Sequence, residues 1–262
     1  MEMRIMYDIE LTVAKDIAYK AGEIMRQYFD ADQARTIKED GTPLTIADTT
    51  INSMVIDGLR RQFPEDGVIG EEESTAEYGM GRRWICDPID GTKAFTWGVP
   101  TAMFSLALVV DGVPQVGVCY EPMLDKMYWA TEKGGAYRNG TKLTVNQEDL
   151  ETGILGTISS SYRIRCAAPY MQKILDRRIQ TAVFSGAVAK CIRVAEGRFV
   201  GYIEELANPH DVAASHIITE EAGGMITTLD GSRLDYKRPF QGVIVSNGKT
   251  HKQLVDIVKT NE

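Results

Sequence analysis

The chain opens with two stretches in which apolar residues follow a helical spacing. From Asp8 to Phe29 they recur every three or four positions, which predicts an amphipathic helix with Asp8 as its N-cap. A second helix is predicted from Thr45 to Phe63, because Thr45 and Asp48 fit a capping box at its start. A loop of charged and turn-forming residues separates the two helices.

The pattern then changes to short runs typical of strands. Two of these runs end in acids: residues 67–69 before Glu71-Glu72-Glu73, and residues 83–86 before Asp87. Three longer runs have the character of an antiparallel meander: 102–110, 115–120 and 127–131. Asn139-Gly140 adds a predicted hairpin turn. These elements predict an α+β N-terminal subdomain, residues 1–146, with an antiparallel sheet.

Beyond residue 146 strands and helices alternate. The expected elements are strand 154–159, helix 169–176, strand 181–184, helix 187–196, strand 199–203, a helix opening at Asn208-Pro209, strand 242–246 and a helix from Lys249. This rhythm is typical of an α/β arrangement. It predicts a C-terminal α/β subdomain, residues 147–262. Because no repeat or low-complexity linker separates the halves, they are expected to pack closely.

Composition narrows the function classes. The 262 residues are 44% hydrophobic, enough for a substantial core. A net charge of −8 argues against a broad surface for nucleic acid or anionic membrane. Four dispersed cysteines form no metal motif and are expected to be reduced. With no signal peptide or membrane-length apolar run in the sequence, a cytoplasmic location is expected.

The segment from Asp87 to Thr92, Asp-Pro-Ile-Asp-Gly-Thr, carries the most specific chemistry. Two carboxylates at the end of an apolar run are costly unless they are paired or bind a metal. Gly91 leaves its N–H open to an anion. A cradle for a divalent cation and a phosphate is therefore predicted, although a proline-containing turn is the commoner origin of such a motif.

Other acids have equally ordinary explanations when taken singly. Asp48 completes a capping box, and Glu71 begins a charge run of the kind found in solvated loops. Asp211 falls in the first turn of a predicted helix, where a carboxylate can cap the helix N-terminus. If Glu71, Asp87, Asp90 and Asp211 meet, their oxygens suit Mg²⁺ or Mn²⁺ rather than Zn²⁺. The three histidines form no metal pair or catalytic triad with a serine elbow.

Four elements in order resemble the signatures of the inositol monophosphatase family of Mg²⁺-dependent, lithium-sensitive phosphatases. They are Thr45 to Asp48, Gly70-Glu71-Glu72, Trp84 to Phe95, and His210 to Ser215 with Glu221-Ala-Gly-Gly224. The resemblance spans nearly the whole chain. It implies a layered α/β/α/β/α sandwich of the sugar-phosphatase type and attack by metal-activated water without a phosphoenzyme.

The resemblance also implies roles for individual residues. Those implied to bind metal are Glu71, Asp87, the Ile89 carbonyl, Asp90 and Asp211. Gly91 and Thr92 would receive the phosphate, and Thr92 would orient the water with Asp48 and Glu71. Asp90 and Asp211 would border the leaving group. Further implied substrate contacts are Ser185, Gly186, Ala187 and Glu204, with Glu205 as the alternative to Glu204 and an ordinary N-cap as the alternative for the 185–186 pair.

Three departures leave the substrate open. His210 stands where the family usually has Trp, Ser215 where Gly is common, and Lys93 where inositol-specific members often carry Asn. The favoured substrate is myo-inositol monophosphate or a related polyol phosphate. The alternatives are histidinol phosphate, fructose 1,6-bisphosphate and 3′-phosphoadenosine 5′-phosphate.

The resemblance further implies inhibition by Li⁺, a homodimer and a small phosphorylated metabolite as partner. Two rival classes stay open at this point. One is a catalytically weak family member that binds metal and serves protein interaction. The other is a metal-free structural protein that binds a polyol or a nucleotide.

Overall fold

The computed structural model describes residues 7–29, 35–37, 43–157 and 170–259. The elements of the first half are α1 (Asp8–Tyr28), β1 (Arg35–Ile37), β2 (Pro43–Thr45), α2 (Ile46–Gln62), β3 (Gly67–Gly70), β4 (Arg82–Asp90), α3 (Thr92–Thr96), β5 (Met103–Val110), β6 (Val113–Glu121), β7 (Lys126–Thr131), β8 (Gly135–Arg138) and β9 (Thr141–Lys142). Those of the second half are β10 (Ile154–Thr157), β11 (Gln180–Val183), α5 (Ala187–Ala195), β12 (Gly201–Glu204), α6 (Pro209–Glu221), β13 (Met225–Thr227), β14 (Val243–Ser246) and α7 (His251–Val258). Residues 170–176 are also helical.

Two sheets organise these elements. The larger has seven strands in the order β3-β4-β5-β6-β7-β8-β9, and the smaller has five in the order β11-β10-β12-β14-β13. β1 and β2 form a separate antiparallel pair. The larger sheet is antiparallel except at its edge, where β3 pairs with β4 in parallel. The smaller sheet is mixed, since β10 is parallel to both neighbours and β14 is antiparallel to both of its own.

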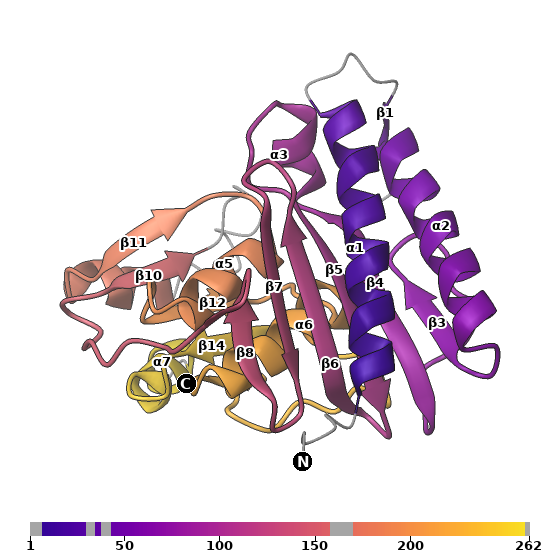
Figure 1. The fold of residues 1–262 in the computed structure, drawn as a ribbon. Coiled ribbons are helices and arrows are strands. Elements are labelled where there is room, and N and C mark those ends of the chain that lie inside the picture. The colour runs from indigo at the N-terminus through magenta and orange to yellow at the C-terminus, as the bar shows by residue number, and fades with distance from the viewer. Residues whose placement is uncertain (1–6, 30–34, 38–42, 158–169, 260–262) are drawn as a thin grey trace.

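The alternation of side chains along the strands sorts the core into layers. On β5, Phe104, Leu106 and Leu108 pack in one apolar cluster with α1 and α2. Ala107 and Val109 point to the opposite face and pack in a second cluster with α5 and α6. Figure 1 shows α1 and α2 side by side along the larger sheet. Helices thus cover both faces of this sheet.

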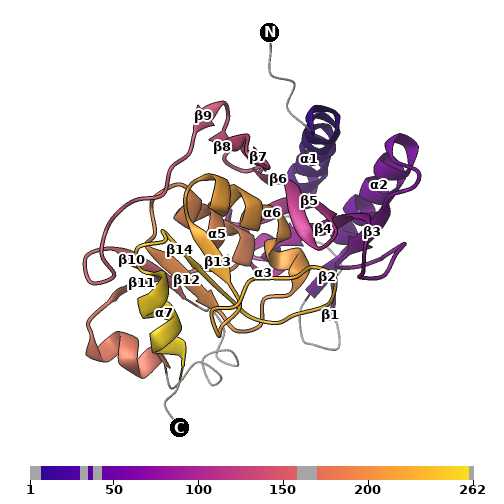
Figure 2. The same cartoon turned by 90° about the horizontal axis from the view of Figure 1, so that it is seen from below.

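The smaller sheet is covered in the same way. α5 and α6 occupy the space between the two sheets, as the rotated view shows (Figure 2). The other face of the smaller sheet packs Ile203 and Ile244 against Ile174 and against Leu254 of α7. The order of layers is α/β/α/β/α, which confirms the predicted sandwich. None of the helices in the described part of the chain is long and apolar enough to cross a membrane.

Several local expectations need correction. The N-cap of α1 is Tyr7 rather than Asp8. The N-terminal sheet is not wholly antiparallel, because β3 joins it in parallel. The sequence patterns did not predict α3, β13 or the β1–β2 pair. Parts of the expected loop before α2, of the strand at 154–159 and of the helix at 169–176 lie outside the described residues.

Candidate active site

The end of β4 carries the central pair of acids. Asp87 pairs with Ser105 and Asp90 with Met103, and the register shifts between these two pairs. Pro88, which lacks a backbone N–H, falls within the irregular stretch. A bulge of this kind re-aims side chains where a strand ends. The segment predicted as a cradle or a turn is therefore an irregular strand end.

Three acids converge at this end of the fold. Carboxylate oxygens of Asp87, Asp90 and Asp211 all lie within 4.8 Å of one another. Asp87 and Asp90 are buried, and the Asp211 side chain keeps 21% of its surface exposed. Asp211 reaches this point from the first turn of α6, where its Oδ2 accepts a hydrogen bond from Asn208 N at 2.6 Å. It therefore caps the helix, as its sequence context predicted, and also joins the acidic cluster.

Glu71 borders this cluster from the neighbouring strand. It follows β3 directly, and its N–H donates to the Cys86 carbonyl at 3.1 Å. β3 and β4 are parallel, so their carboxyl ends, and hence Glu71 and Asp87, lie at the same edge of the sheet. The charge of Glu71 helps to raise the pKa of Asp87. Within the described residues, however, Glu71 is not one of the three acids that share the 4.8 Å radius.

The electrostatics of the cluster favour a cation. Burial, and then repulsion by Glu71, Asp90, Asp211 and Asp48, raises the pKa of Asp87 well above its ordinary value. Burial and Asp211 raise the pKa of Asp90 to about 7, although the N–H groups of α5 lower it in part.

The oxygens of the cluster also suit a metal ion. Asp87 Oδ1 is buried and has no hydrogen-bond partner in the part of the chain that the structure describes. A divalent cation would give this oxygen a partner and offset the repulsion among the acids. A carboxylate donor set without His or Cys fits Mg²⁺ or Mn²⁺.

Asp48, at the start of α2, also lies near the acidic cluster. Its Oδ2 accepts hydrogen bonds from Thr45 N at 2.8 Å and Thr45 Oγ1 at 2.6 Å, so the predicted capping box is confirmed. Its other oxygen, Oδ1, is buried and has no partner among the described residues. Burial raises the pKa of Asp48 to about 6, against the hydrogen bonds from Thr45. Asp48 in turn helps to raise the pKa of Asp87.

Gly91 and Thr92 turn the chain from β4 into α3. Gly91 has a φ of +83°, a conformation that favours glycine, and it is the N-cap of α3. Thr92 Oγ1 donates to the Ile89 carbonyl at 3.0 Å. A carbonyl oxygen has a second lone pair, so this bond is compatible with the predicted role of Ile89 as a metal ligand. The proposed phosphate contacts of Gly91 and Thr92 stay predictions.

The loop at 185–187 docks directly onto Asp90. Asp90 Oδ1 accepts from Ala187 N at 2.8 Å, and Oδ2 from Ala189 N at 3.4 Å. The N-cap of α5 is Gly186, without a side-chain cap, so the N-cap considered for the 185–186 pair is present at its second residue and Ser185 does not cap the helix. A Cβ on Gly186 would lie 2.8 Å from Asp90 Oδ2. The predicted substrate loop is therefore attached to an acid of the cluster, and only glycine fits at its centre.

Glu204 and Glu205 point to different surroundings at the end of β12. Glu204 is 1% exposed, and its Oε2 accepts from Tyr202 Oη at 2.7 Å. The charge of Glu204 helps to raise the pKa of Asp211. Glu205 instead lies near Tyr170, and its charge, after burial, raises the pKa of that phenol. Glu204 is thus the member of the pair on the side of the acidic cluster.

Two neighbours of the cluster were not singled out from the sequence. Tyr78 lies in the loop after β3. Its pKa is raised by burial and, to a smaller extent, by the nearby charge of Asp211. Lys190 of α5 is buried beside Glu204, with its Nζ 3.9 Å from Glu204 Oε2. A signal for Lys190 was present, because it interrupts the apolar residues from 187 to 192 at the start of the predicted helix. Tyr78 carries no comparable sequence signal.

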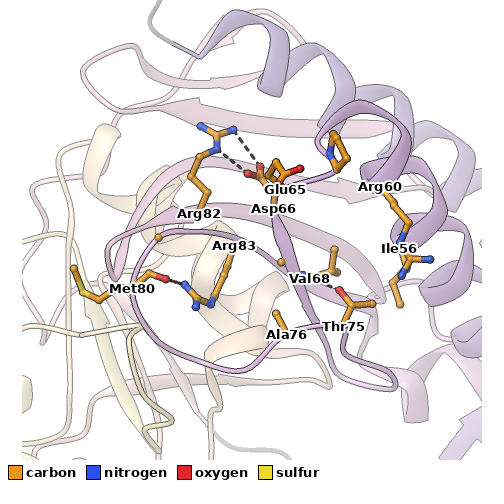
Figure 3. A pocket seen from close by; sticks show the side chains of 13 residues that line it. Ile56, Arg60, Glu65, Asp66, Val68, Thr75, Ala76, Met80, Arg82 and Arg83 are labelled. Carbon is orange, nitrogen blue, oxygen red and sulfur yellow. Dashed lines mark hydrogen bonds and ion pairs between the residues drawn. The ribbon is translucent and has the colours of Figure 1, made fainter.

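A separate pocket lies at the opposite end of β4 (Figure 3). It has a volume of about 510 Å³ and is lined in part by Arg60, Arg82 and Arg83. Arg82 bonds Asp66 and Glu10, and Arg83 bonds the carbonyls of residues 77 and 80. At about 3.3 Å per residue, Arg82 is roughly 17 Å from Asp87 along the strand. This pocket is therefore distinct from the acidic cluster.

An oxygen-rich acidic cluster at the strand ends of a layered α/β sandwich is the arrangement of a metal-dependent phosphatase. Comparison with known proteins gives the family. The sequence profile of the inositol monophosphatase family matches residues 7–262. The chain belongs to this family and is a phosphomonoesterase.

Individual relatives carry different substrate names. A histidinol-phosphatase from Chlorobaculum parvum is 32% identical, with 97% of this chain and 98% of the relative covered. A fructose-1,6-bisphosphatase/inositol-1-monophosphatase from Thermotoga maritima is also 32% identical, over 82% of each chain. The solved structure of a T. maritima inositol monophosphatase superposes with a TM-score of 0.86 at 28% identity, covering 97% of both chains.

Proposed function

We propose that the chain hydrolyses a small polyol or sugar phosphate in a reaction that depends on Mg²⁺, with Mn²⁺ as a possible substitute. The observation that carries the proposal is the convergence of Asp87, Asp90 and Asp211 within 4.8 Å at a largely buried site. Such a group of acids is electrostatically unfavourable without a cation. Family membership supplies the reaction class.

The residues proposed to hold the cation are Glu71, Asp87, the Ile89 carbonyl, Asp90 and Asp211. When bound, Mg²⁺ lowers the pKa of water and offsets charge on the attacking and leaving oxygens. Thr92 Oγ1 donates its proton to the Ile89 carbonyl, so its lone pairs can accept a hydrogen bond from the attacking water. Asp48 and Glu71 are the proposed acidic partners of that water.

Different residues of the site are proposed to bind the phosphate and the alcohol of the substrate. Gly91 and Thr92 are proposed to bind the phosphate through their N–H groups. Asp90 holds the 185–187 loop through the amides of α5, and this loop is proposed to contact the substrate. Asp211 and Glu204 are proposed to accept hydrogen bonds from the hydroxyls of the leaving alcohol. The site thereby separates the metal and phosphate side from the leaving-group side.

The favoured substrate is myo-inositol monophosphate. Hydroxyl donors around its ring match the carboxylate acceptors on the leaving-group side. Histidinol phosphate is the second candidate, because the C. parvum relative, which aligns over nearly its whole length, is named a histidinol-phosphatase. Fructose 1,6-bisphosphate and 3′-phosphoadenosine 5′-phosphate complete the set of alternatives.

A phosphate-release panel of these four esters with Mg²⁺ tests the proposal. We expect the highest kcat/KM with myo-inositol 1-phosphate and loss of activity on addition of a chelator. Preference for histidinol phosphate would replace the substrate but keep the mechanism. Release from none of the four would contradict the proposed function.

The same assay addresses the rival interpretation as a metal-binding interaction protein. Asp90→Asn is expected to abolish nearly all phosphate release, whereas a pure binding module would keep its partner. Calorimetry with Mg²⁺, before and after chelation, tests metal binding independently of turnover. Inhibition by Li⁺ and a homodimer are further proposals from the family, to be checked by the phosphate assay and by gel filtration with light scattering.

A further inference from the structure

One lysine is buried in the wall of the acidic site. Lys190 lies in the second turn of α5 and is 1% exposed. Among the polar side chains that are buried in the described part of the chain, it is the single lysine or arginine. A buried ammonium is costly unless it is paired and hydrogen-bonded. Its position is therefore determined by the groups around it.

These groups come from both sheets. Lys190 Nζ donates to the Thr157 carbonyl at the end of β10, at 3.2 Å, and lies 3.9 Å from Glu204 Oε2 at the end of β12. It is also 4.6 Å from the centre of the Tyr202 ring, a cation–π distance. From the larger sheet, the positive charge of Lys190 helps to lower the pKa of Asp90. Lys190 thus connects the strand ends that frame the site.

Glu204 is held from several directions by this arrangement. Its Oε2 accepts from Tyr202 Oη at 2.7 Å and faces Lys190, while its Oε1 accepts from Leu206 N at 3.4 Å. Tyr202 and Lys190 together restrict the carboxylate, and the lysine supplies the compensating charge. The charge of Lys190 also offsets the repulsion between Glu204 and Asp211, which raises the pKa of Asp211 after burial.

We propose that Lys190 is a positioning residue for substrate selection: its ammonium fixes the Glu204 carboxylate on the Asp211 side of the site, where it accepts hydrogen bonds from leaving-group hydroxyls. This inference rests on the proposed function. Lys190 acts through Glu204 and does not touch the substrate. Loss of the ammonium should therefore weaken recognition of hydroxylated alcohols and leave phosphate binding largely intact.

The test compares two phosphate esters. myo-Inositol 1-phosphate presents hydroxyl donors, whereas 4-nitrophenyl phosphate has an aromatic leaving group without them. For Lys190→Met we expect KM to rise about tenfold or more for the inositol ester, the value of one hydrogen bond to a charged group. KM for the nitrophenyl ester should change less than about threefold, and kcat should be similar for both esters.

Two variants give controls. Lys190→Arg keeps the charge and should restore selectivity to within about threefold of the wild type. Lys173→Met removes a lysine that also bonds backbone carbonyls, those of Ile257 and Lys259, but lies apart from the acids. It should leave both KM values unchanged. Mg²⁺ calorimetry on Lys190→Met should show an affinity at least equal to that of the wild type, because a nearby positive charge has been removed.

A double variant keeps the inference falsifiable if Lys190→Met does not fold. Breaking a buried pair by removing one partner is strongly destabilising, whereas removing both charges is far less so. Lys190→Met with Glu204→Gln should therefore fold and should match Glu204→Gln alone in its ratio of KM values. A further loss of selectivity in the double variant would show that Lys190 does not act through Glu204.

The outcomes separate this inference from the proposed function. Equal losses with both esters, or a tenfold weaker affinity for Mg²⁺ in Lys190→Met, would overturn the positioning role while the wild-type activity stands. A wild-type protein that releases phosphate from neither ester would overturn this inference, and release from none of the four panel esters either would overturn the proposed function as well.

Discussion

Asp48 allows a direct test of whether a helix cap also serves the chemistry. Its Oδ2 forms the capping box with Thr45, while its Oδ1 is buried without a partner among the described residues. The replacement Asp48→Asn keeps an acceptor for Thr45 and removes the charge. If Asp48 only caps, the variant should be slightly less stable, by up to about 1 kcal/mol, at every pH.

The raised pKa of Asp48 predicts instead that Asp48→Asn makes the protein more stable. The pKa of Asp48 is about 6 in the folded protein, compared with 3.8 ordinarily. The folded state therefore holds its proton more tightly than the unfolded state, and stability is lost as the pH rises from about 4 to about 6. A difference of about 2 units corresponds to about 3 kcal/mol above pH 6. Asp48→Asn should recover most of this at pH 8 and only about 0.5 kcal/mol near pH 4.

Urea denaturation in the presence of a chelator, at pH 8 and at pH 4, measures this difference. Asp57→Asn, an exposed acid on the same helix, is the matched control and should change stability by less than about 0.5 kcal/mol. With Mg²⁺ present, Asp48→Asn should lower kcat about a hundredfold if the carboxylate is a partner of the attacking water. A variant that is no more stable than the wild type at pH 8 would refute the electrostatic reasoning. An unchanged kcat would leave Asp48 as a cap alone.

Three further predictions follow from the same geometry. Asp87→Asn should weaken Mg²⁺ binding at least tenfold in calorimetry without lowering the melting temperature of the chelated protein, because it removes a charge that Glu71, Asp90 and Asp211 repel; a clear fall in that melting temperature would contradict this. Gly186→Ala should lower kcat/KM at least tenfold, since the new methyl would lie 2.8 Å from Asp90 Oδ2 at a φ of +103°, while Gly58→Ala, at a position with ordinary contacts, should not. Mg²⁺ at a hundred times its Kd should stabilise the protein by about 2.7 kcal/mol, seen as a higher melting temperature that a chelator abolishes.

Local signals in the sequence predicted the features that depend on neighbours along the chain. The capping box of Thr45 and Asp48 is one example, since both partners lie within one helical turn. The apolar spacing of α1 and the apolar runs of β5 to β7 are others. The bulge between Asp87 and Asp90 was not predictable, because it depends on how β4 pairs with β5.

Contacts between distant segments account for most of what was missed. Asp90 and Ala187 are 97 residues apart, and only the packing of α5 between the sheets brings them together. Lys190 carried a sequence signal, a lysine among the apolar residues 187–192, but no local pattern names Glu204 as its partner. The convergence of Asp211 with the β4 acids was reached through family resemblance, which supplies tertiary information that spacing lacks.

Asp90 shows why the acids and the substrate loop form one unit. Its carboxylate accepts the amides of Ala187 and Ala189, and the same carboxylate lies within the cluster formed with Asp87 and Asp211. Protonation of Asp90, whose pKa is about 7, would weaken its bonds to these amides because a neutral acid is a poorer acceptor. A cation in the cluster favours the ionised form. Metal binding should therefore strengthen the attachment of the 185–187 loop, so that the leaving-group wall is fixed most firmly when the metal is present.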